Sequence, residues 1–127
     1  METQREQEPS LNRERFVEVI RIVVQDAAVA DTISLLSSPP GRRPKEDLVA
    51  RSKWFNALSF QDRQQIERII EMTERSAVFG IPCVLDGARA IEDPSDKGVV
   101  DLRYRRGDLD ISLNDKTGPT LHDLLAP

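Results

Sequence analysis

The segment 11–30 constrains the fold most, because it contains neither glycine nor proline. Its middle, Phe16–Val24, is rich in β-branched residues, which are common in strands. The polar residues favour a helix instead: at about 100° per residue they gather within about 60° of arc. These residues are Glu14, Glu18, Arg21 and Gln25. We therefore predict a helix over 10–36, capped by Ser10, with this polar stripe facing solvent.

The apolar side of this helix is wider than one packing face needs. It comprises Val17, Val19, Ile20, Ile22, Val23 and Val24. A helix that is apolar over most of its circumference is buried in the domain or covered by another molecule. The pattern predicts a central helix or a homodimer that forms through Phe16–Val24.

Two further helices follow a loop over 37–44 that contains three prolines and a glycine. Acidic residues near the positive end of the helix dipole favour a helix over 45–57. The capping-box pattern at 59–62 precedes an apolar stripe at helical spacing. This stripe predicts a helix over 60–86, kinked near Pro82.

The last third of the chain changes to strand periodicity. Residues 99–105 and 109–113 alternate with period two around a glycine turn, and we expect 88–92 to join them as a third strand. An alternative makes 81–85 a strand that turns into 88–92 through a hairpin. The sequence thus predicts an α+β fold of three main helices and a small antiparallel sheet.

Composition limits the class of protein. The 127 residues are 39% hydrophobic and 31% charged, which fits one domain over 10–127 after a tail over 1–9. A net charge of −4 disfavours general nucleic-acid binding. No apolar run is long enough to span a membrane.

The start of the chain lacks the pattern of a secretory signal. The single cysteine, Cys83, is interpreted as a buried structural thiol. We expect a soluble cytoplasmic protein.

His122 is the only histidine and the only candidate for general acid or base work near neutral pH. Its possible partners are Asp86, Asn114 and Asp123, which would make a small hydrolase or ligand-binding enzyme. A hydrogen-bonding role in the terminal turn is the simpler interpretation of His122. No ligand set for a metal and no glycine-rich phosphate loop is present, so we predict no cofactor.

Two surface features indicate partners. Trp54 follows the basic loop that carries Arg42 and Arg43, and an exposed tryptophan beside arginines is typical of a protein-binding hot spot. The run Arg103-Tyr104-Arg105-Arg106 offers a weaker alternative, single-strand nucleic-acid binding. Nearby aspartates favour cross-strand ion pairs there instead.

The leading functional hypothesis is a non-enzymatic protein-interaction protein that self-associates. An inhibitor, a neutralising protein and an adaptor all fit its size and composition. The partner itself is not identified by the sequence. The enzyme built on His122 and the nucleic-acid binder built on Arg103–Arg106 are the alternatives.

Overall fold

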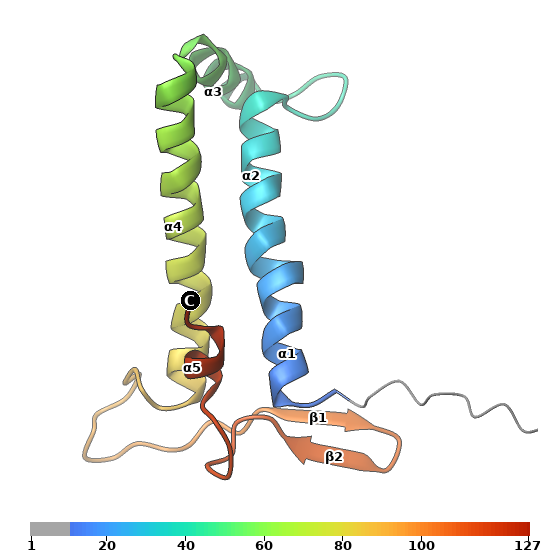
Figure 1. Cartoon of the computed structure of the whole chain (residues 1–127), viewed down its shortest axis with the longest axis vertical. Helices are drawn as coiled ribbons and strands as arrows, with labels where there is room; N and C mark the ends of the chain where they lie inside the picture. Colours follow the sequence, from blue (N-terminus) through green and yellow to red (C-terminus); the bar gives the residue numbers. More distant parts are fainter. Residues whose placement is uncertain (1–10) are drawn as a thin grey trace, which may run out of the picture.

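The structure is a computed structural model that describes residues 11–127, and two long helices lying side by side dominate it (Figure 1). The first long helix runs without a break through three segments, which are α1 (Arg13–Val19), η1 (Ile20–Asp26) and α2 (Ala27–Ser37). The second is α4 (Phe60–Leu85), which returns antiparallel to the first. Within the described residues, no helix is both long and apolar enough to cross a bilayer.

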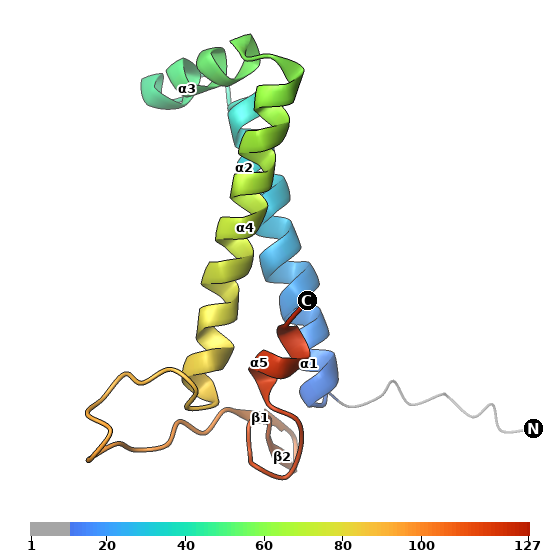
Figure 2. The same ribbon diagram turned by 60° about the vertical axis from the view of Figure 1, so that its left-hand side comes forward.

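The ends of this helix pair carry different elements. At one end, α3 (Glu46–Ala57) lies across the pair (Figure 2). At the other end lies an antiparallel hairpin of β1 (Arg103–Arg106) and β2 (Leu109–Ser112). The short helix α5 (Leu121–Leu125) contacts both α1 and α4. The predicted α+β class is confirmed, with helix bounds close to those expected.

Side-chain caps explain where the helices begin. The Ser59 hydroxyl accepts a hydrogen bond from the Asp62 N–H at 3.1 Å, as the capping pattern predicts. The first helix begins at Arg13, and the Asn12 side chain caps it by accepting from the Arg15 N–H at 2.8 Å. Asn12 takes the role predicted for Ser10, since either side chain can cap. Ser10 and the expected tail over 1–9 lie outside the described residues.

The π-helical segment η1 was not predicted, and it changes which side chains face inward. Val17 and Gln25 are eight residues apart, so a regular α-helix would place them about 80° apart. A π-helix turns by only roughly 80° per residue, which brings the two within roughly 20°. Gln25 is accordingly buried, at 7% exposure, while Val24 is 44% exposed. The prediction of a solvent-facing stripe is therefore wrong at Gln25.

The sheet is smaller than expected, with two strands rather than three. Residues 88–92 form no strand, and the first strand covers Arg103–Arg106 instead of 99–105. The Asn114 side chain ends the ladder: its Oδ1 accepts from the Leu102 N–H at 2.9 Å and its Nδ2 donates to the Val100 carbonyl at 2.7 Å. A side chain thus satisfies the backbone groups that a longer strand would have paired.

Helix α4 continues to Leu85, so the alternative of a strand over 81–85 is wrong. The helix includes Pro82, whose carbonyl accepts from the Asp86 N–H at 2.9 Å. Gly87 follows with φ of 75°, a left-handed conformation that glycine adopts easily at a helix end. The kink expected near Pro82 stays a prediction.

The buried core is concentrated at the two ends of the long helices. Val17, Leu121 and Leu125 form the larger cluster, where α1, α4 and α5 meet. Phe55 of α3 is buried at the opposite end. Large apolar side chains between the ends are exposed, among them Ile22, Val23, Val24, Ile69 and Met72. In the middle of the helix pair, many apolar side chains are therefore exposed rather than packed against other elements.

Candidate functional site

His122 and Asp86 lie in direct contact although 36 residues separate them. The ring Nδ1 is 2.8 Å from Asp86 Oδ2, and the same oxygen accepts from the His122 backbone N–H at 2.8 Å. The Asp86 side chain is 4% exposed and that of His122 is 24% exposed. The end of α4 positions the carboxylate, and the first turn of α5 positions the imidazole. One of the three predicted partners of His122 is thus in place.

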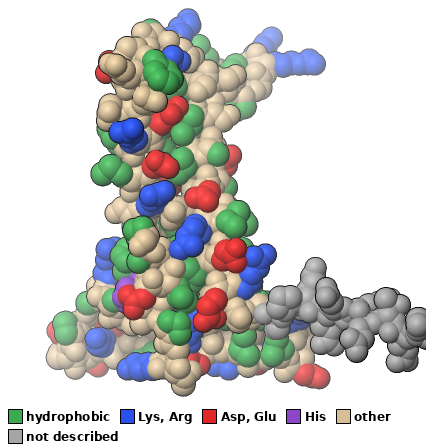
Figure 3. Space-filling model, in the orientation of Figure 1, with side chains coloured by type: hydrophobic (Ala, Val, Ile, Leu, Met, Phe, Trp, Pro, Cys, Tyr) green, Lys and Arg blue, Asp and Glu red, His purple; other side chains and the backbone are tan. Residues whose placement is uncertain are grey.

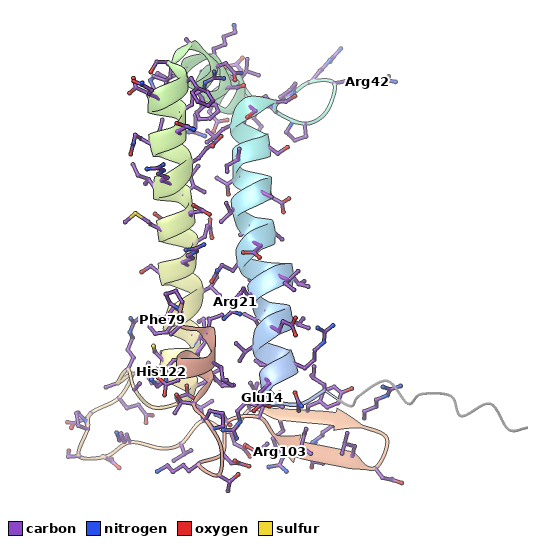
Figure 4. The ribbon with its side chains drawn as sticks, viewed as in Figure 1. Glu14, Arg21, Arg42, Phe79, Arg103 and His122 are labelled. Atoms are coloured by element: carbon purple, nitrogen blue, oxygen red, sulfur yellow. The ribbon has the colours of Figure 1, made fainter. Side chains whose placement is uncertain are left out.

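The other groups around His122 hold the ring rather than complete a reactive set. The Phe79 ring and the imidazole form a T-shaped contact, with ring centroids 6.2 Å apart and planes at 75°. Figure 4 labels both residues. Asp123 Oδ1 is 3.6 Å from Nε2 and the Asp123 side chain is exposed. Asp86 and Thr120 together accept backbone N–H groups at the start of α5. The arrangement caps and docks α5, as the simpler interpretation of His122 expects.

Asn114 is not a partner of His122. Its amide nitrogen donates to the Leu85 carbonyl at 2.9 Å as well as to Val100, and its oxygen accepts from Leu102. The side chain therefore ties the segment after α4 to the hairpin. Every one of these bonds is structural, and none is directed at an imidazole.

A cavity of about 900 Å³ lies beside this pair, between the segment after α4 and the hairpin. Asp86 and Asn114 line it, but His122 does not. Cys83 is buried and free. Within residues 11–127 there is no cluster of three His, Cys, Asp or Glu that could hold a metal ion. The geometry gives an oriented imidazole, and the hydrolase alternative stays a prediction.

The predicted partner-binding residues are exposed. Trp54 is 54% exposed on α3, next to the buried Phe55. Arg42 and Arg43 are exposed in the loop between α2 and α3, and Arg42 projects into solvent (Figure 4). Among the described residues, no hydrogen bond or ring contact joins Trp54 to either arginine. Each of these side chains is exposed to a partner, and their role in binding stays a prediction.

The basic run at Arg103–Arg106 is largely matched by acids. Arg103 Nη1 is 2.9 Å from Asp101 Oδ2, and its Nε is 2.8 Å from Asp110 Oδ1. Arg105 is 3.5 Å from the other oxygen of Asp110. The hydrogen bond from Arg103 lowers the pKa of Asp101 and of Asp110 below the ordinary value, with Ser112 adding to the effect at Asp101. These are the ion pairs that alternating charges predict.

We expect the hairpin to loosen in acid. A carboxyl group whose pKa is lowered on folding stabilises the fold fully above its ordinary pKa, and that contribution is lost as the pH falls through the lowered value. For Asp101 and Asp110, the loss should begin below about pH 4. Amide NMR signals of β1 and β2, followed from pH 6 to pH 2, would report it. In Arg103→Gln, the same signals should titrate at a higher pH, because Ser112 and Arg105 alone lower the pKa of Asp101 and Asp110 less. Identical titrations in both proteins would contradict the assignment.

Two arginines, Arg13 and Arg21, attach the C-terminal segment to the first helix, and the sequence analysis names only Arg21. Arg13 is largely buried and donates to Asp115 at 2.7 Å and to the Pro119 carbonyl at 2.6 Å. A Cβ at Gly118 would lie 3.1 Å from Arg13 Nη1, so this close approach favours glycine. Arg21 donates to the Leu124 and Leu125 carbonyls at 3.0 and 3.3 Å. The predicted solvent-facing role of Arg21 is therefore wrong.

A pattern in the sequence could have indicated this attachment. Arg13, Val17 and Arg21 recur every four residues and share one helix face, with the buried valine between the arginines. The sequence does not indicate which segment contacts this face, and that segment lies more than a hundred residues away.

Comparisons with protein-family models, with curated proteins and with solved structures found no match to this chain.

Proposed function

We propose that this protein works by binding other proteins, and first of all a second copy of itself, through Phe16–Val24. The observation that carries the proposal is the exposure of consecutive apolar residues in η1. Ile22, Val23 and Val24 are 53%, 63% and 44% exposed. A contiguous apolar patch of this kind on a water-exposed helix is typical of an interaction surface.

The surface area supports a second copy as the occupant. The whole chain exposes 10130 Å² at a mass of 14.4 kDa. A compact monomer of this mass exposes about 6,800 Å². Even if the full area of an extended chain, about 1,700 Å², is subtracted for residues 1–10 as an upper bound, an excess of about 1,600 Å² is left. Stable dimers of standard size cover roughly 600 to 1,000 Å² of each protomer, so the excess suffices for a dimer.

The second long helix could extend the same interface. Ile69 and Met72 are exposed one turn apart on α4. Figure 3 shows hydrophobic side chains among the charged ones along both long helices. Two antiparallel pairs that share such faces would form a four-helix arrangement, in which each copy supplies the apolar cover that the other lacks.

A charge at Val23 should separate the two copies. We expect the wild-type protein to have about twice the monomer mass at 50 µM, and Val23→Asp to be a monomer at that concentration, because a buried unpaired charge is costly. The expected loss of dimer affinity is at least about 100-fold. Light scattering behind size exclusion gives the mass, and circular dichroism should show unchanged helix content because Val23 is exposed in the single chain.

Val99→Asp is the matched control, since Val99 is 89% exposed outside the helices. This variant should dimerise like the wild type. A monomeric wild type, or a Val23→Asp variant that still dimerises, would refute the proposed interface.

Partners other than a second copy would bind at the end of the helix pair that carries α3. The exposed Trp54 and the Arg42 and Arg43 side chains suit an acidic protein surface, as arginine pairs readily with carboxylates. We include a cytoplasmic location in the proposal, which the free thiol of Cys83 supports. The adaptor, inhibitor and neutralising roles all belong to this class.

A further inference from the structure

We propose that the cavity between η1, α4 and the end of α5 binds a small organic carboxylate with an aromatic or branched apolar body. The cavity measures about 460 Å³, within the range of small-molecule sites. Arg21, Gln25 and Asp26 line it from η1, and Arg75 and Phe79 line it from α4. This inference does not depend on self-association.

Gln25 supplies the first argument. Its side chain borders the cavity, the residue is only 7% exposed, and among the described residues it makes no side-chain hydrogen bond. In the described part of the chain, Arg63 Nε is the one fully enclosed side-chain polar atom without a partner, so the Gln25 amide atoms reach the water of the cavity. The π-helical turn of η1 brings Gln25 inward, and π-helical segments are frequent at functional sites. The amide therefore offers both a donor and an acceptor to a molecule in the cavity.

The charged side chains around the cavity favour a negatively charged ligand. Arg21 uses its Nη2 for the α5 carbonyls, so its Nε and Nη1 are free of those bonds. Arg75 has only a long contact of 3.7 Å to Glu71. Asp26 is the only acidic side chain of the lining, and the exposed Glu71 reaches Arg75 from outside it. The guanidinium forks of Arg21 and Arg75 fit a carboxylate, which would compete with this weak exposed pair for Arg75.

The apolar residues of the lining favour a hydrocarbon group in the ligand. The Phe79 ring, Leu125 and Pro127 contribute apolar surface to the cavity. An aromatic or branched hydrocarbon would cover that surface, and an aromatic ring could meet Phe79 edge to face. Figure 4 shows Arg21 reaching from the first helix toward α5, in the space between the two long helices. One carboxylate joined to a small apolar body satisfies both parts of the site.

The test uses 3-phenylpropionate as the probe and 3-phenylpropan-1-ol as its neutral counterpart. We expect saturable binding of the acid by isothermal titration calorimetry, with the alcohol at least about tenfold weaker. Arg75→Gln and Gln25→Leu should each weaken binding of the acid about tenfold. Nitrogen-15 NMR of the Gln25 side-chain amide should shift with the acid in proportion to occupancy.

Arg68→Gln is the matched control, because Arg68 is an exposed arginine of α4 outside the cavity. It should bind the acid like the wild type. Val23→Asp should bind equally well, which separates this proposal from the dimer. No saturation at millimolar acid, equal affinity for the alcohol, or an equal loss in Arg68→Gln would each overturn the assignment.

Discussion

Leu121→Ala is expected to lower the free energy of unfolding by about 3 kcal/mol and the melting temperature by roughly 10 °C. Leu121 is 0% exposed at the centre of the cluster that joins α1, α4 and α5. Truncation removes its hydrophobic contribution and leaves a cavity that Val17 and Leu125 cannot fill without moving. Urea denaturation followed by circular dichroism measures the change.

The matched control for this prediction is Leu35→Ala, which removes the same atoms from an exposed position on α2. Its loss should be clearly smaller, below about 2 kcal/mol, because Leu35 is already 37% exposed and its truncation leaves no closed cavity. Equal losses in the two variants would mean that α5 does not form a tightly packed core with the long helices.

Asp86→Ala is expected to cost about 2 kcal/mol, because the change leaves two donors of His122 without their acceptor. The Asp86 carboxylate is almost completely buried and serves both the ring Nδ1 and the backbone N–H. The effect should be local: α5 should lose protection from hydrogen exchange while α3 keeps it. Exchange measured by mass spectrometry distinguishes these segments.

Asp123→Ala provides the comparison, since this exposed carboxylate lies 3.6 Å from the other ring nitrogen. An exposed pair of this kind contributes little, so the change should cost under about 0.5 kcal/mol. His122→Ala should fall between the two, because it removes the ring contact but keeps the backbone bond to Asp86. If Asp86→Ala were as stable as Asp123→Ala, the buried contact would not exist in solution.

The helices were predictable because their signals are local. The Ser59 cap, the proline-rich loop over 37–44 and the stripe of α4 act over a few residues, and the structure confirms the elements that they indicate. The length of the first strand was not predictable from local signals. The Asn114 side chain, twelve residues further along the chain, binds the Leu102 N–H in place of a strand partner. The alternation of side chains along a strand carries no information about such a bond.

The sequence predicts which residues are candidates for a site, but not which of them lie together in the structure. Asp86 was a proposed partner of His122, but only the packing of α5 against the end of α4 brings the two together. A constant helical period predicts an outward Gln25, whereas η1 changes the period for seven residues and turns this side chain inward. The sequence shows no proline or glycine there to indicate the change.

The attachment of α5 to the first helix has a consequence for folding. Arg13 and Arg21 bind groups 102 to 106 residues further along the chain, so the core at this end cannot close until those residues are synthesised. During translation, Val17 and its neighbours would stay uncovered after the long helices have formed, which invites chaperone binding or premature association between nascent chains.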